Sequence, residues 1–235
     1  MSGPTARPTI DDRPLSPTLR TTVNRGRARA RTERQDLCDV LAAALVCHLG
    51  LLVDGAPVVL PTAFGVDLDG PDAGGTIYLH GSIASRSLRS APDADVCVTL
   101  TMLDGLVLAR SAFHHSMNYR SAVILGRPRV VDDPVERLRA LDLIVDQVVP
   151  GRSGTLRPHT GRELAATSVV ALALAEASVK VRSGDPVDDV GDLGGGEWAG
   201  VIPLRLGSGP IVTSADAAGV EPPRHVHVRA ASLAW

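Results

Sequence analysis

Hydrophobic and polar positions follow a helical pattern near the start of the chain and an alternating pattern after it. Leu37, Val40, Leu41, Ala44 and Leu45 recur at helical spacing. The run Thr32-Glu33-Arg34-Gln35 in front of them fits a capping box. We therefore expect a helix from residue 32 to about 49. His48 falls on its apolar face and is interpreted as a core histidine.

Short apolar runs separated by Gly, Pro and Asp occupy residues 57–131, which is typical of β-strands joined by turns. Asp104-Gly105 has the composition of a two-residue hairpin turn. No helical pattern separates these runs, so the sequence predicts an antiparallel barrel or sandwich. The strands we expect cover residues 58–64, 76–81, 96–100 and 106–113, and a fifth lies within 111–131.

The second half of the chain mixes the two patterns. Asp133-Pro134 predicts a helix start, and Pro150-Gly151 predicts its end. Residues 163–180 suit a helix by composition, whereas their later part alternates and favours a strand from about Ser168. Trp198 to Leu206 reads as a last strand. We expect three segments: a disordered Arg-rich arm (1–31), one folded domain (32–206) and a loose C-terminal tail (207–235).

Composition limits the classes of function. Residues 1–35 carry eight arginines against three acidic residues, which leaves the remainder acidic in a chain of net charge -2. A basic arm can contact nucleic acid or an anionic membrane. Six aromatic residues in an acidic body argue against a nucleic-acid platform, and no apolar run is long enough to span a bilayer. We expect neither nucleic acid nor membrane as a partner.

Three scattered cysteines do not form a disulfide framework or a zinc pattern, and they favour the reducing cytoplasm. The histidines lack metal-ligand spacing, so no metal site is expected. The chain also has no Walker loop, HExxH, CxxC or G-x-S-x-G motif. Common nucleotide-hydrolysis, zinc-protease and serine-hydrolase chemistries therefore have no support.

Two polar clusters do indicate a site. The first, Ser116 to Ser121, lies at the mouth of the fifth expected strand. The second, His80-Gly81-Ser82 with Ser85-Arg86-Ser87, follows the strand at 76–81. Hydroxyls and a guanidinium after a strand suit an oxyanion. Taken together, the clusters favour a cofactor that carries a phosphate, although each alone also fits a polar loop.

The block from Tyr78 to Arg129 and the order of its neighbours resemble the pyridoxamine 5'-phosphate oxidase-like, FMN-binding split-barrel proteins. The likeness is greatest to the flavin-nucleotide-binding branch related to nitroimidazole-resistance reductases, and it extends over about residues 27–206. This resemblance implies a mainly β fold, a six-stranded antiparallel split β-barrel with flanking helices. It also implies a homodimer with two FMN sites at the interface, and a barrel strand at residues 168–182.

The same resemblance implies roles for individual residues. Ser85, Arg86 and Ser87 match the turn that holds the FMN phosphate and ribityl chain, with Ser87 where the oxidases have Lys. His80 matches a histidine beside the flavin and is the candidate proton donor. The remaining candidates for contact with the cofactor are Thr62, Asn118, Tyr119, Arg120, Ser121, Lys180, Arg182 and Trp198.

The implied activity is that of a cytoplasmic FMN-dependent oxidoreductase. It would pass electrons from a nicotinamide donor to a small organic acceptor. Three alternatives stay open: the same fold using F420 or haem, a flavin-binding protein without catalysis, and a nucleic-acid regulator acting through the arginine arm. The substrate motif of true pyridoxamine phosphate oxidases is absent, since Arg224-His225 does not reproduce it in context.

Overall fold

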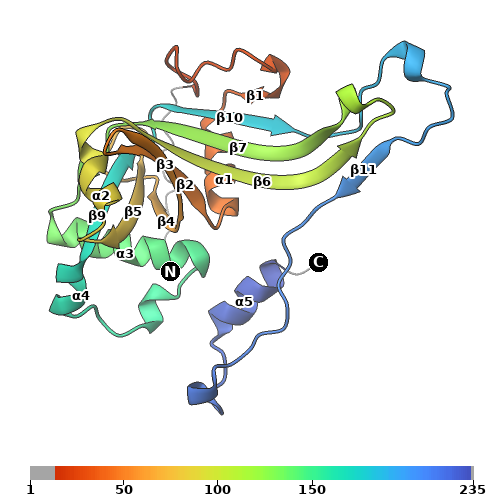
Figure 1. Cartoon of the computed structure of the whole chain (residues 1–235). Helices are drawn as coiled ribbons and strands as arrows, with labels where there is room; N and C mark the ends of the chain where they lie inside the picture. The colour runs from red at the N-terminus through yellow and green to blue at the C-terminus, as the bar shows by residue number, and fades with distance from the viewer. Residues whose placement is uncertain (1–13, 234–235) are drawn as a thin grey trace, which may run out of the picture.

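The computed structural model describes residues 14–233, which form mainly antiparallel β-sheet (Figure 1). The helices are α1 (Arg34–Ala43), α2 (Arg86–Ser90), α3 (Pro134–Val148), α4 (Gly161–Ala166) and α5 (Arg224–Ser232). The strands are β1 (Ala30–Arg31), β2 (Cys47–Val53), β3 (Ala56–Thr62), β4 (Phe64–Asp67), β5 (Thr76–Ser82), β6 (Val96–Leu108), β7 (Ser116–Gly126), β8 (Arg129–Val130), β9 (Thr167–Ala173), β10 (Ala177–Arg182) and β11 (Gly200–Pro203).

These strands form two sheets that share one core. The larger sheet has the order β1-β10-β7-β6-β2-β3, with β11 paired to residues 105–108 of β6, and the smaller has the order β4-β5-β9-β8. Every pairing is antiparallel. The arrangement agrees with the expected split barrel, although the described residues form eleven strands, counting two of two residues, rather than six.

The main core lies between the two sheets and α1. Alternating residues of each strand point inward, such as Leu49 and Val98 from the larger sheet and Phe64 and Leu79 from the smaller one. A second apolar cluster joins α3 to the other face of the smaller sheet through Tyr78, Ala140 and Ile144. Figure 1 shows α3 alongside β4 and β5.

A glycine allows α3 to approach the smaller sheet closely. A Cβ atom added to Gly65 on β4 would lie 2.6 Å from the Ile144 nitrogen and 2.8 Å from the Leu143 carbonyl carbon. Both are backbone atoms of α3, so neither can move aside cheaply. The absence of a side chain at residue 65 therefore fixes the distance between helix and sheet.

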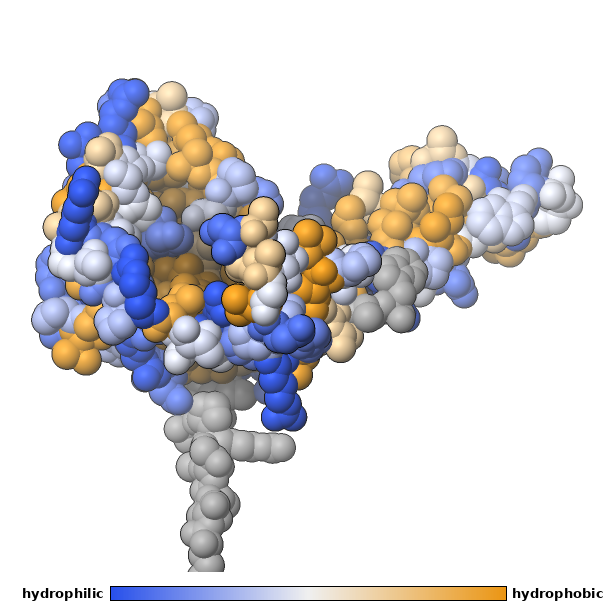
Figure 2. Space-filling model, turned by 90° about the horizontal axis from the view of Figure 1, so that it is seen from below, coloured by the Kyte–Doolittle hydropathy of each residue, from blue (hydrophilic) through white to orange (hydrophobic). Residues whose placement is uncertain are grey.

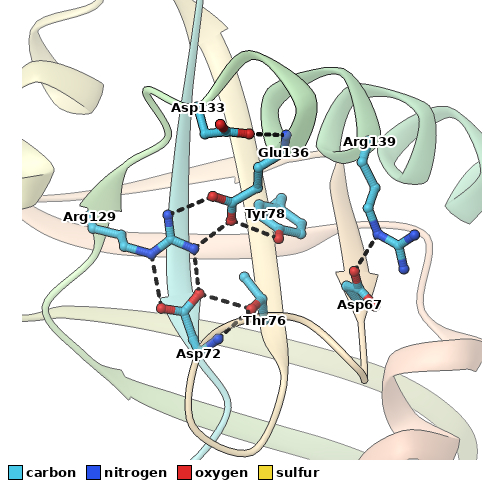
Figure 3. A network of polar contacts seen from close by, with 8 residues as sticks. All are labelled: Asp67, Asp72, Thr76, Tyr78, Arg129, Asp133, Glu136 and Arg139. Carbon is cyan, nitrogen blue, oxygen red and sulfur yellow. Dashed lines mark hydrogen bonds and ion pairs between the residues drawn. The ribbon is translucent and has the colours of Figure 1, made fainter.

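A network centred on Arg129 ties α3 to β5, β8 and the loop before β5 (Figure 3). Arg129 donates to both oxygens of Asp72, at 2.9 and 2.8 Å, and to both oxygens of Glu136. The Tyr78 hydroxyl donates to Glu136 at 2.9 Å. Asp133 accepts from the Glu136 N–H at 2.8 Å, which confirms the predicted cap of α3.

The helix predicted from residue 32 to 49 is wrong in its second half. Helix α1 ends at Ala43, and Cys47–Val53 forms β2, which pairs with β3 and β6. The predicted capping box does not form, since Glu33 is the N-cap and has no side-chain cap bond. His48 lies exposed on β2 rather than in a core. Strand partners on both sides outweigh the helical spacing of this segment.

The hairpin predicted at Asp104-Gly105 is also wrong. Strand β6 runs through both residues with a bulge between Leu103 and Gly105, and the chain reverses only after Leu108. Gly105 faces β11 instead: a Cβ there would lie 3.0 Å from a Val201 methyl carbon. The lack of a side chain at Gly105 thus allows β11 to pair closely with β6.

Because the turn comes late, the β6–β7 hairpin extends beyond the body. We call residues 103–119 and 182–203 the arm, which is distinct from the Arg-rich segment at residues 1–31. Figure 1 shows the arm projecting from the body, and Figure 2 shows apolar residues along it. Phe113 is 90% exposed and Val190 85% exposed at its surface. Such a concentration of exposed apolar residues is typical of an interaction surface.

The two terminal segments are more ordered than predicted. Leu15 and Thr21 are buried, and Arg20 forms ion pairs with Asp95 and Glu176, so residues 14–31 pack on the body. Residues 1–13 lie outside the described residues. The expected loose tail contains α5, and the Ser208 N–H donates to the Leu233 carbonyl.

The ambiguous segment 163–182 divides into three elements. Glu163 and Thr160 form a capping box at the start of α4, and β9 begins directly after that helix at Thr167. The strand expected from Ser168 to Arg182 is two strands, β9 in the smaller sheet and β10 in the larger. The last strand is confirmed in part: β11 covers Gly200–Pro203 and leaves Trp198 outside it.

Candidate functional site

The turn after β5 carries the predicted phosphate-binding residues. Ser85 is the N-cap of α2 but makes no side-chain cap bond, and Arg86 and Ser87 follow it in the first turn. Arg86 pairs with Asp54 at 3.0 Å, and both side chains are more than 70% exposed. Such an exposed pair is weak. The Arg86 guanidinium can therefore exchange Asp54 for an anionic ligand at little cost.

His80 lies on β5, just before this turn and opposite Val169 of β9. Its Nδ1 atom is buried and has no hydrogen-bond partner among the described residues. Burial lowers the pKa of His80, because a charged imidazole is poorly solvated there. The side chain is thus held neutral near pH 7 with one ring nitrogen free to bind a ligand group.

The candidate residues of β7 divide into two groups. Asn118 is buried, donates to the Gly184 carbonyl at 3.1 Å and accepts from Arg182. Arg120 donates hydrogen bonds to both carboxylate oxygens of Asp104, at 3.0 and 2.8 Å. Asn118 thus ties β7 to residues 182–184, and Arg120 ties β7 to β6 through its Nε and one terminal nitrogen. Tyr119, between them, is half-buried.

Ser121 and Lys180 lie opposite each other on β7 and β10. Together with Ser178 they line a pocket of about 220 Å³, which the N-terminal segment closes with Arg20 and Asn24. The sequence did not indicate this cover, because residues 1–31 resemble a free tail in composition.

The two other candidates lie elsewhere. Thr62 ends β3, and its hydroxyl donates to the Ala63 carbonyl at 3.2 Å. Trp198 belongs to the arm, is 67% exposed and lies over Gly200. Apart from Thr62 on β3, the candidates therefore form three groups in one copy of the chain: the turn after β5 with His80, the Ser121–Lys180 pocket, and the arm with the adjoining Arg120. No pocket found among the described residues contains members of all three.

Two larger pockets were not predicted. One, of about 760 Å³, runs between the α1–β2 connection, β6 and residues 204–206, and His48 and Arg120 line it. The other, of about 640 Å³, lies between α5 and Pro150 at the end of α3. The sequence feature that could have indicated the pocket beside α5 is the basic, histidine-containing run from Arg224 to Arg229. The sequence analysis places this run in a loose tail.

The arm also carries a cluster of possible metal ligands. One ligand atom from each of His114, Asp189 and Asp192 lies within 4.8 Å of the others, and His114 Nε2 is 3.2 Å from an Asp189 oxygen. These residues come from two separate turns, so their spacing in the sequence did not indicate the cluster. In the part of the chain that the structure describes, no helix is long and apolar enough to cross a bilayer.

Comparison with known proteins identifies the family. The sequence pattern of the pyridoxamine 5'-phosphate oxidase family matches residues 33–181. The chain belongs to that family. A search of curated protein sequences finds no match. The family match covers both sheets apart from β1, β11 and the last residue of β10.

Solved structures extend the similarity beyond the family core. The flavocytochrome Anf3 from Azotobacter vinelandii is 36% identical, with a TM-score of 0.84 over 92% of this chain and 98% of that chain. The FAD and haem binding protein from Mycobacterium smegmatis is 38% identical, with a TM-score of 0.78 over 86% of this chain and 97% of that chain.

A candidate 5-nitroimidazole antibiotic resistance protein from Bacteroides thetaiotaomicron shares the fold alone. It is 22% identical, with a TM-score of 0.52 over 65% of this chain and 86% of that chain. The mainly β split-barrel fold implied by the sequence resemblance is therefore confirmed.

Proposed function

We propose that this chain is a flavin-binding redox protein that also binds haem. The observation that carries the proposal is its 36% and 38% identity, over most of its length, to a flavocytochrome and to an FAD and haem binding protein. The turn after β5 supports the flavin part, because it presents an arginine held only by an exposed ion pair. The fold alone would not support it, since one fold serves many chemistries.

The residues at the turn fit the phosphate of a flavin nucleotide. Arg86 supplies a fork of donors for phosphate oxygens, and the hydroxyls of Ser85 and Ser87 flank it on the same turn. His80, whose Nδ1 atom has no partner among the described residues, lies near the end of β5, just before this turn. FMN, the cofactor expected from the sequence, and FAD both carry this phosphate, so the turn accepts either.

The divided positions of the other candidates favour a site shared by two copies. The pocket lined by Ser121 and Lys180 includes no residue of the turn after β5. Trp198 is exposed on the arm, together with Phe113, Val190 and other apolar residues. We propose a homodimer in which the arm packs on the partner, because exposed apolar surface of this kind is usually buried in a complex. Light scattering of the purified protein tests this, and a monomer would contradict it.

A bound flavin supplies the hydride and single-electron chemistry, and the protein supplies position and electrostatics. His80 is neutral near pH 7 because burial lowers its pKa, so it can hold or relay a proton beside the ring. We propose a nicotinamide donor and a small organic acceptor in the cytoplasm. If no nicotinamide reduces the bound flavin in an anaerobic assay, the protein is a flavin-binding protein without this activity.

The first test is the absorption spectrum of the purified protein, with mass analysis of the chromophores released by heat. Released flavin together with haem supports the proposal, and the mass separates FMN from FAD. Released F420 would replace the flavin in this site. A colourless protein that takes up neither added flavin nor haemin would refute it.

A second test addresses the turn. Arg86→Ala should weaken flavin binding by about 1.5–3 kcal/mol, the scale of a hydrogen bond to a charged group. Arg162→Ala, which removes an exposed arginine of α4, is the matched control and should leave affinity unchanged. Equal affinities of the two variants in a titration would place the phosphate elsewhere.

A further inference from the structure

The pocket beside α5 has the size and lining of a cofactor site. Its volume of about 640 Å³ falls within the roughly 300–1,000 Å³ that is usual for small-molecule sites. Val228 and Pro150 give it apolar walls, and Arg224 and Arg229 add positive charge. Its lining contains no acidic residue. The pocket therefore suits a largely apolar ligand with anionic groups.

One histidine in this lining has an unused ligand atom. The Nε2 atom of His225 is buried and has no hydrogen-bond partner among the described residues. Leaving a buried polar atom without a hydrogen-bond partner is unfavourable, so such an atom calls for a partner. A neutral imidazole nitrogen is the commonest protein ligand of metals and the usual proximal ligand of haem iron. His227, two residues along α5, is exposed and does not line the pocket.

Helix α5 lacks the packing that normally stabilises a short helix. It has nine residues, and none of them is buried. It is attached by hydrogen bonds, among them the one from Arg229 Nε to the Val148 carbonyl at 2.8 Å and the one from the Ser208 hydroxyl to the Ala230 carbonyl. Isolated helices of this length are marginal in water. A ligand in the pocket would supply the missing apolar contact.

The match to a solved flavocytochrome extends beyond the family pattern. The family pattern ends at residue 181, which leaves 54 residues of the chain after it. The match to the flavocytochrome covers 92% of the chain and so leaves only about 19 residues unmatched. Most of the C-terminal segment is therefore shared with a flavocytochrome, whereas the antibiotic resistance protein matches 65% of the chain.

We propose that haem binds in the pocket beside α5, with His225 Nε2 as an axial ligand and Arg224 and Arg229 facing the propionates. The Arg229 bond to the Val148 carbonyl uses Nε, so among the described residues its two terminal nitrogens keep donors for an anionic group. Figure 1 shows α5 next to the end of α3, where Pro150 forms the opposite wall. This inference rests on the proposed binding of haem and assigns its site.

The test compares six full-length proteins: wild type, His225→Ala, His225→Tyr, His227→Ala, His80→Ala and His48→Ala. Each is purified after expression with added haem precursor, and haem and flavin are quantified separately. We expect His225→Ala to lose at least tenfold in haem affinity while it keeps wild-type flavin content. We expect His227→Ala to match wild type. His225→Tyr should retain haem with a shifted Soret band and a changed electron paramagnetic resonance spectrum, because the iron ligand becomes an oxygen.

The outcomes distinguish the assignment of His225 as the haem ligand from the binding of haem by the protein. Haem content and spectra that are unchanged in both His225 variants would overturn the assignment, as would loss of haem in His80→Ala or His48→Ala alone. A wild-type protein that binds flavin but takes up no haemin would refute haem binding itself. Retained flavin in His225→Ala shows that this variant is folded. If His225→Ala does not fold, the spectrum of His225→Tyr decides whether residue 225 binds the haem iron.

Discussion

Replacement of Arg129 by alanine tests whether the network in Figure 3 fastens α3 to the smaller sheet. The change removes four hydrogen bonds to charged groups, two to Asp72 and two to Glu136. It also leaves two carboxylates near each other without a cation. Their side chains are only 18% and 17% exposed, whereas that of Arg129 is 38% exposed.

The expected loss lies between two limits. Exposed ion pairs contribute about 0–1 kcal/mol, and breaking a fully buried pair costs about 3–5 kcal/mol. Because Arg129 is partly exposed, solvent screens part of its attraction, and we expect a loss of about 2–3 kcal/mol. For a chain of this size that lowers the melting temperature by about 4–12 °C.

The same variant should alter the response to acid. Arg129 lowers the pKa of Asp72, so the ionised carboxylate stabilises the folded state above its ordinary pKa near 3.8. This contribution disappears as pH falls through the lower pKa of the folded state. The stability of Arg129→Ala should therefore fall less steeply than that of wild type below about pH 4.

Urea unfolding at pH 7 and at about pH 3, followed by circular dichroism, measures both effects. The matched control is Arg157→Ala, which breaks the exposed pair with Glu163 and should cost clearly less than Arg129→Ala, because solvent screens an exposed pair. Equal losses for Arg129→Ala and Arg157→Ala would refute the reasoning, since partial burial would then make no difference.

Three further changes test other parts of the structure. Gly65→Ala should destabilise the protein by at least about 2 kcal/mol in urea unfolding, because the added methyl group meets α3 backbone, whereas Gly154→Ala, with open space around it, should change stability by less than about 0.5 kcal/mol. Burial raises the pKa of Cys47 to about 12, so mass spectrometry should find Cys47 unmodified after native protein is treated with iodoacetamide at pH 8, and modified after denaturation. Because burial lowers the pKa of His80, flavin-free wild type should lose stability as pH falls below about 6.5, and by more than His80→Asn does; equal losses would mean that His80 is not the group responsible.

The sequence alone determined those parts of the fold that depend on neighbouring residues. The cap at Asp133 forms as predicted because its carboxylate accepts from an N–H only three residues away. The strand at Thr76–Ser82 begins where predicted, directly after the Gly- and Asp-rich run at residues 67–75. The resemblance in the block from Tyr78 to Arg129 correctly indicated the family, because that block lies within the 33–181 match.

Tertiary structure decided whatever depended on distant partners. Asp104-Gly105 is a bulge because β11, about 100 residues later, pairs with it, and Cys47–Val53 is a strand because β3 and β6 flank it. The positions of the site residues were decided in the same way: Arg120 is held by Asp104 from the neighbouring strand, and Lys180 meets Ser121 across two strands. His225 gained its setting only when α5 came to lie against the end of α3. Local patterns record the preferences of the backbone, whereas burial and pairing depend on the whole chain.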